Sequence, residues 1–434
     1  MTDRSHRRPR PLSPLREHLR DTLWFAPTAG LAGAVLLWWA AGALDDRIVT
    51  VLREEGAYAE LRALISIAED AKTIVTTISS AMMTFIGVVF SISLVAVQMA
   101  SGQLTPRVVR IFVRSRISKA TLTVFLATFL FSLLVLTSYE SETDARQVTS
   151  VPVVQSLATM ALVGLSLLLF IAYVSSTLRL MQVGPVVDRI TRESLRMAAR
   201  QPAGAGEPVA LAAEIGRIPH RGRAGVLRDV HVARLVRLAR RRGVVLRLLP
   251  RIGDFVVAGT PVLAVHADGP VRVRVPPYTV SVGTERTFHQ DLGLGLRQLS
   301  DIALRALSPA VNDPTTAVQC LDRMVELLSA VAGDALGAVH HRDRSGTVRL
   351  IQPVPAWEHL VDLGLTEIRT AAAEQPQVTR RLLAAIDDLL LLVPPERGAP
   401  LLRHRALLVQ AVVRAVPEAA DREFALRPDR QGIG

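Results

Sequence analysis

The sequence TIVTTISSAMMTFIGVVFSISLVAVQ, residues 73–98, decides the fold of this chain. It contains no Asp, Glu, Lys, Arg or His, and it exceeds the roughly 20 apolar residues that a helix needs to cross a bilayer. Its polar residues recur every seven positions: Thr77, Thr84, Ser91 and Gln98 form one line, and Thr73, Ser80 and Gly87 form a second line beside it. On a helix of about 3.6 residues per turn, this spacing keeps each line on one slowly drifting face. The stretch therefore predicts a membrane-spanning helix with a polar stripe.

Two interpretations of this stripe compete, and both use its six polar side chains: Thr73, Thr77, Ser80, Thr84, Ser91 and Gln98. Serine and threonine in a membrane helix can donate to their own preceding carbonyls, and small residues commonly mark helix–helix contacts. The stripe is then a packing face. Alternatively, the hydroxyls and the Gln98 amide line a hydrated path. Because no charge lies along it, such a path would be passive and weakly selective.

The composition of the rest of the chain also indicates a membrane protein. Half of the residues are hydrophobic, the mean hydropathy is +0.31, and the apolar residues concentrate before residue 180. Four runs are long enough to span a bilayer: 24–43, 73–99, 120–139 and 153–178. The charged segment 44–72 has helical spacing and predicts an interfacial helix that runs into the second span. No ionisable residue lies in the middle of any span, which disfavours proton relays and ion-coupled transport.

The loop charges predict the orientation of these spans. The connection after the second span carries five basic residues and no acidic one: Arg107, Arg110, Arg114, Arg116 and Lys119. By the positive-inside rule this loop is cytoplasmic, whereas the connection over residues 140–146 is acidic on balance and is external. Both termini are then cytoplasmic. The net charge of +12 is explained by arginines facing the anionic headgroups of the lipid bilayer, and we expect no nucleic-acid partner.

The pattern after residue 180 predicts a cytoplasmic α+β domain. We divide the chain into a basic tail (1–22), a four-span transmembrane domain (23–180), an amphipathic helix with a linker (181–206), a β-rich unit (207–290) and a helical domain (291–434). In the β-rich unit, the valine-rich segments 244–249, 255–259, 261–267 and 271–276 predict strands of a small β-barrel or sandwich around a helix at 231–242. In the helical domain we expect helices at 291–307, 314–331, 357–373, 377–392 and 399–416, a strand at 347–352 and a frayed end.

The inventory of reactive residues argues against a cofactor, a metal site or an enzyme. The hairpin-like RIGDFVVAGTPVLAV (251–265) resembles part of biotinyl and lipoyl carrier domains, but the chain has no lysine after Lys119 to carry either group. Cys320 is the only cysteine, so there is no disulfide framework or thiolate zinc cluster. His340 and His341 are adjacent rather than spaced for a metal on a helix.

The densest polar constellation after the spans is LRQLSDIALRALSPAVNDPTTAVQCLDRM, residues 296–324. Asp301 and Arg305 have the spacing of a helical ion pair, and Asn312 with Asp313 precedes a proline as a helix cap does. As catalytic machinery the group is incomplete, because no nucleophile has a base beside it. We therefore interpret Asp301, Arg305, Asn312 and Asp313 as a hinge or subunit interface, with a small-ligand pocket as the alternative.

Two segments, 90–116 and 301–324, resemble the signature segments of a family of bacterial predicted membrane proteins, domain of unknown function 2254. The resemblance covers most of the chain. It implies a four-span inner-membrane protein with a cytoplasmic domain, and it supplies no activity or catalytic residues. Our leading hypothesis is an oligomeric channel-like protein whose second spans line a path that the cytoplasmic domain gates. The alternative is a non-conducting membrane-anchored sensor or scaffold; an enzyme acting on lipid is more distant.

Overall fold

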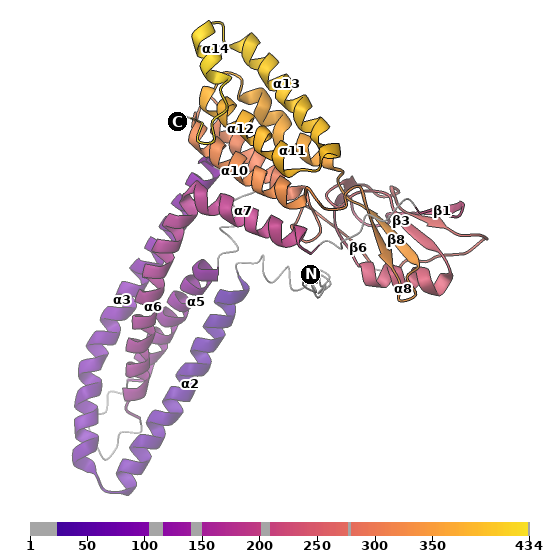
Figure 1. Cartoon of the computed structure of the whole chain (residues 1–434). Coiled ribbons are helices and arrows are strands. Elements are labelled where there is room, and N and C mark those ends of the chain that lie inside the picture. The colour runs from indigo at the N-terminus through magenta and orange to yellow at the C-terminus, as the bar shows by residue number, and fades with distance from the viewer. Residues whose placement is uncertain (1–23, 104–115, 140–149, 201–208, 277–278, 433–434) are drawn as a thin grey trace. The chain divides into compact units, whose positions relative to one another are not determined.

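The computed structural model describes residues 24–103, 116–139, 150–200, 209–276 and 279–432. These residues form two compact units that divide after Gln182 (Figure 1). We call them the four-helix unit and the C-terminal unit.

The four-helix unit consists of α2 (Phe25–Glu54), α3 (Tyr58–Gln103), α5 (Arg116–Thr137) and α6 (Val153–Met181). All four helices are long and apolar enough to cross a membrane, and their number equals the number of spans predicted from the sequence. Helix α5 packs against each of the other three. Small polar residues connect the helices inside this unit: Ser79 Oγ donates to Ser132 Oγ at 2.8 Å, and the hydroxyls of Thr128 and Ser166 lie 3.1 Å apart.

The helices α2 and α3 are longer than the spans predicted for them. The expected interfacial helix over residues 44–72 is not a separate element; it comprises the end of α2, a turn at Gly56 with a φ of 68°, and the start of α3. No proline lies between Ala57 and Gln103, so nothing in the backbone interrupts α3. Its 46 residues make a helix of about 69 Å, more than twice the roughly 30 Å of a hydrocarbon core.

A buried aspartate anchors the start of α6. Asp45 of α2 is 1% exposed, and its carboxylate accepts the backbone N–H groups of Val154 and Gln155 at 2.8 and 3.2 Å. The N-cap position of α6 is Pro152, which offers no side-chain acceptor. Asp45 therefore supplies from another helix the cap that the local sequence lacks.

The C-terminal unit is mixed in secondary structure, as predicted. Its helices are α7 (Val183–Ala198), α8 (Val232–Arg242), α9 (Leu294–Ala306), α10 (Pro314–Val331), α11 (Trp357–Ala371), α12 (Pro376–Leu392), a 3-10 turn η1 (Pro395–Arg397), α13 (Gly398–Ala415) and α14 (Ala419–Ala425). Helix α7 lies inside the predicted segment 181–206, and α8 to α13 lie within three residues of the expected bounds. The turn η1 was not predicted, and α14 occupies residues that we expected to be frayed.

The strands form two open sheets rather than a barrel. One sheet has the order β1 (Glu214–Pro219), β5 (Pro261–His266), β3 (Val245–Leu248), β8 (Val348–Pro353) and β7 (Ala338–Arg342), and the other has β4 (Phe255–Val256), β2 (Gly225–Val230) and β6 (Val280–Gly283). The β3–β8 pair is parallel and the other pairs are antiparallel. In the described part of the chain no sheet closes on itself, so the barrel, one of the two forms predicted for this unit beside the sandwich, is wrong. Residues 271–276, predicted as a strand, pair with no other strand in this part.

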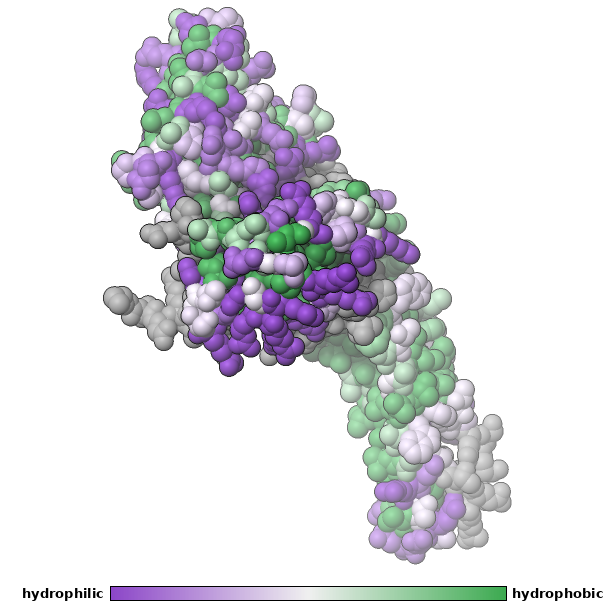
Figure 2. Space-filling view, turned by 90° about the vertical axis from the view of Figure 1, so that its right-hand side faces the viewer, coloured by the Kyte–Doolittle hydropathy of each residue, from purple (hydrophilic) through white to green (hydrophobic). Residues whose placement is uncertain are grey.

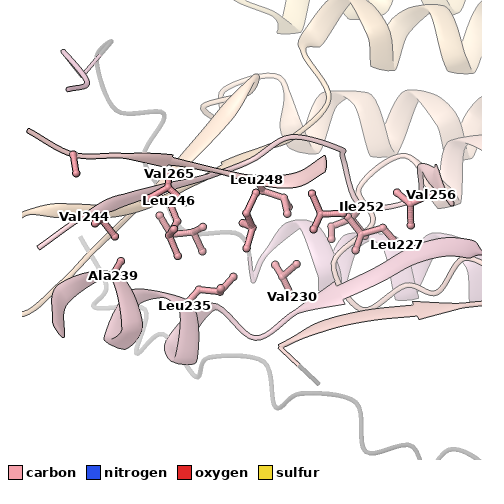
Figure 3. Close-up of a cluster of buried hydrophobic side chains, with 14 residues drawn as sticks. Leu227, Val230, Leu235, Ala239, Val244, Leu246, Leu248, Ile252, Val256 and Val265 are labelled. Atoms are coloured by element: carbon pink, nitrogen blue, oxygen red, sulfur yellow. The ribbon is translucent and has the colours of Figure 1, made fainter. Parts of the chain in front are cut away.

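The hydrophobic core of the β-containing part lies between the five-stranded sheet and α8 (Figure 3). Leu246 and Leu248 of β3 face Leu235 and Ala239 of α8, and all four are at most 1% exposed. Gly243 ends α8 in the left-handed conformation, with a φ of 69°. The helix thus presents one face to the core and leaves its other face to its surroundings.

Candidate functional site: the polar stripe of α3

The polar stripe lies on the outer surface of the four-helix unit. Thr73, Thr77, Ser80, Thr84, Ser91 and Gln98 are all exposed, as is Gly87 between them. The stripe is not continuous, because Leu94 occupies the next position of the second line and is also exposed. In the described chain, none of the six side chains faces another helix of the unit.

A buried seam on the opposite side of α3 holds this helix in the unit. It consists of Leu61, Ala68, Val75, Met82, Val89 and Ala96, which recur every seven residues and are all at most 4% exposed. Val75 packs with Phe131 and Val135 of α5, and Met82 and Val89 pack with Phe125 and Tyr173. This spacing is that of coiled-coil packing.

The angle between stripe and seam follows from helix geometry. Residues of one stripe line stand two positions after a seam residue, as Thr84 follows Met82, and those of the other line stand two positions before one. At about 100° per residue, both lines fall within about 20° of the direction opposite the seam. The polar stripe therefore points as directly away from its own bundle as a helix allows.

Two hydroxyls of the stripe satisfy their donors within α3 itself. Thr77 Oγ1 donates to the carbonyl oxygen of Thr73 at 2.9 Å, and Ser80 Oγ donates to that of Thr76 at 3.2 Å. Each hydroxyl oxygen keeps acceptor capacity. Among the described helices of the four-helix unit, these six side chains therefore have no packing partner. Contact with another part of the protein or another copy and a hydrated path are both compatible with this placement.

The sequence profile of a protein family described as "Predicted membrane protein (DUF2254)" matches residues 20–388. This chain belongs to that family. Among the relatives of this DUF2254 protein are uncharacterised proteins of Mycobacterium tuberculosis strain H37Rv and of Mycobacterium bovis. Each is 30% identical over an alignment 434 positions long, which covers 95% of this chain and 79% of the relative. No solved structure matches the chain.

The predicted hinge of this DUF2254 protein lies at the junction of α9 and α10. Asp313 caps α10: its carboxylate accepts the Thr316 N–H at 3.0 Å and the Thr316 hydroxyl at 2.6 Å. Asn312 has a φ of 48°, a left-handed conformation that asparagine tolerates better than most residues. The carboxylate of Asp301 lies 2.9 Å from Arg297, which also reaches Glu367 of α11 at 3.1 Å. Sequence reasoning missed Arg297, although it stands four residues before Asp301.

The predicted basic loop is only partly described. Arg107, Arg110 and Arg114 lie outside the described residues, Arg116 is the first residue of α5, and Lys119 lies in its first turn. Across the described residues, no group of three or more His, Cys, Asp or Glu side chains could hold a metal ion. Cys320 is buried in α10, and this burial raises the pKa of its thiol to about 12.

Proposed function

We propose that this DUF2254 protein is an oligomeric, channel-like membrane protein in which α3 of each copy turns the polar stripe toward a shared path. One observation carries the proposal: the stripe points away from the seam that holds α3 in its own unit. A neutral polar line facing lipid gains nothing from its hydroxyls, whereas the same line facing a common axis offers acceptors to water and solutes. A second copy is the simplest source of that axis.

The chemistry of the stripe favours passive flow. Residues 73–98 contain no ionisable side chain, so the path has no group to take up and release protons and no fixed charge to bind a coupling ion. Hydroxyl and amide groups replace part of a hydration shell without strong selectivity. We expect conduction of small solutes or ions with weak discrimination.

We further propose that the protein lies in the bacterial inner membrane with both termini in the cytoplasm, where the C-terminal unit controls opening. The arginine-rich connection over residues 104–119 supports this orientation. The short connection between the two units supports this control of opening. Gln182 alone separates the last residue of α6 from the first residue of α7. In this proposal, a movement of the C-terminal unit reaches the last membrane helix through this one-residue connection.

Flux from liposomes tests the channel function. The full chain is reconstituted, and release of a small dye and of potassium is measured under voltage and membrane tension. Thr84→Leu and Ser91→Leu should change the flux at least several-fold, because each replaces a hydroxyl by a larger apolar side chain. Met83→Leu and Phe90→Leu are matched controls, because these neighbouring residues are exposed on α3 but off the stripe. Absence of flux from a correctly folded oligomer would favour the non-conducting sensor or scaffold instead.

A further inference from the structure

The outer face of α8 carries a dense cluster of arginines. Between Glu214 and Gly283 the chain has 13 arginines and four acidic residues, and five of these arginines lie in the 11 residues of α8. They are Arg234, Arg237, Arg240, Arg241 and Arg242, and all five are exposed. We call this face the arginine surface. Figure 2 shows the hydrophilic residues gathered on the face of this part of the molecule that is turned toward the viewer.

No carboxylate in the described part of the C-terminal unit forms an ion pair with the arginine surface. Ion pairs among the described residues join many arginines of the C-terminal unit to carboxylates, as Arg286 to Asp291 and Arg349 to Asp343, but none involves an arginine of α8. The helix contains no acidic residue. Three of its arginines lie in the last turn, where the negative end of the helix dipole favours them. These charges remain available to an outside anionic partner.

The opposite face of α8 determines how such a partner is bound. Leu235 and Ala239 are completely buried in the core beneath β3, so the helix cannot turn its apolar side outward without unfolding that core. Helix α8 therefore cannot insert an apolar face among acyl chains, as amphipathic surface helices do. Binding is restricted to contacts between guanidinium groups and a surface of phosphates.

We infer that the arginine surface docks on the headgroups of an anionic bilayer. The chain carries four helices able to span a membrane, so a bilayer is always within reach of the C-terminal unit at high effective concentration. Arginine matches phosphate oxygens in a bidentate manner. No Phe, Tyr or Trp lies between Ile215 and Asp254, so the surface lacks the aromatic platforms on which single-stranded nucleic acids stack. The inference is independent of whether the protein conducts.

Site-specific quenching tests this docking in the full chain. Ala233→Cys places a thiol on α8 without removing an arginine, and the native Cys320 is fully buried, so a fluorophore labels α8 alone. The protein is placed in nanodiscs of phosphatidylcholine, or of phosphatidylcholine with 30% phosphatidylglycerol, each with a nitroxide on a fraction of the headgroups. We expect strong quenching in the anionic discs at low salt, and a loss of quenching in neutral discs or at high salt.

Charge variants assign the quenching to the arginine surface. Replacing the five arginines by glutamine should abolish quenching, whereas replacing them by lysine should keep most of it, since each basic residue near an anionic surface contributes about five-fold to binding. Arg240→Gln with Arg241→Gln should weaken docking roughly 30-fold. The matched pair Arg344→Gln with Arg414→Gln removes two other exposed arginines and should leave docking unchanged.

Three results would overturn the inference. The first is equal quenching in neutral and anionic discs, and the second is quenching that survives the five-glutamine variant. The third is binding of a DNA duplex that requires the same five arginines while the anionic discs show no quenching, which would assign the surface to nucleic acid. Protection of Cys320 from thiol reagents in each variant confirms that the C-terminal unit is folded.

Discussion

At the scale of single residues, the cap of α10 is held by one side chain. Asp313 accepts two hydrogen bonds from Thr316, and loss of an N-cap costs about 1 kcal/mol. Asp313→Ala should destabilise the C-terminal unit by about that amount, and Asp313→Asn by only a few tenths, because asparagine caps equally well. The readout is the denaturant dependence of Cys320 labelling, since this thiol lies in α10 itself. Equal destabilisation by both variants would show that the cap is not the cause.

A buried histidine makes the stability of the same unit depend on pH. His404 of α13 is 2% exposed, and its Nε2 lies 2.8 Å from Asp362 Oδ1. Burial lowers the pKa of His404 below its ordinary value of 6.5, although Asp362 partly opposes the shift. The unfolded chain therefore binds a proton that the folded chain resists, so stability is full above about pH 6.5 and falls as the pH decreases below it.

His404→Gln should flatten this decline between pH 7 and 5, because glutamine can donate to Asp362 without titrating. Thermal unfolding of the C-terminal unit, followed through Cys320 labelling, measures the effect. Some slope should persist, since burial also lowers the pKa of His340 and His359. An unchanged slope in the variant would contradict the assignment to His404.

Single residues show how far the sequence alone can lead. The cap at Asp313 was predictable, because the cap and the amides that it serves lie within four residues. The cap that Asp45 gives to α6 was not, because Val154 lies 109 positions away. Distance along the sequence also separates the two partners of Arg297. Its pairing with Asp301 could have been predicted from the spacing of four residues, whereas its pairing with Glu367, 70 positions away, could not.

At the scale of elements, one glycine sets how closely two helices of the four-helix unit approach. A Cβ on Gly30 of α2 would overlap Thr123 Cγ2 of α5 and lie 3.3 Å from the Thr123 carbonyl oxygen, whereas a Cβ on Gly33 would meet nothing within 4 Å. Gly30→Val should destabilise the unit by about 1–3 kcal/mol, and Gly33→Val should be close to neutral. Thermal unfolding in detergent compares the two; similar losses would indicate a general effect of valine in α2.

Elements were predicted well where their signal is local. The long apolar helices could be predicted from length and composition alone. Most helices of the C-terminal unit could be predicted from hydrophobic periodicity and from capping residues. The segment 271–276 shows the limit: its alternation correctly gives partly buried valines and exposed arginines, but alternation does not say whether a neighbouring strand is there to pair. Strand β7 carries His340, His341 and Arg342 and has too little apolar alternation to be recognised.

At the scale of the whole molecule, the proposed assembly predicts which positions of neighbouring copies meet. Thr84→Cys and Ser91→Cys should form cross-linked dimers in membranes, because the proposal places them near a common axis. Met83→Cys and Phe90→Cys should cross-link far less, since each lies about 100° around the helix from its neighbour on the stripe. Non-reducing electrophoresis gives the yields, and the buried Cys320 adds no background. Equal yields at all four positions would contradict a shared axis lined by the stripe.

The length of α3 has a mechanical consequence. A straight helix of 46 residues that tilts by about 5° around its centre carries each end sideways by about 3 Å, and its length of about 69 Å exceeds the roughly 30 Å of a hydrocarbon core. A force applied to one end of α3 outside the bilayer therefore tilts the whole helix around a point inside the bilayer. Because no proline interrupts the helix, a tilt that starts at either end is transmitted to the segment that carries Thr84 and Ser91.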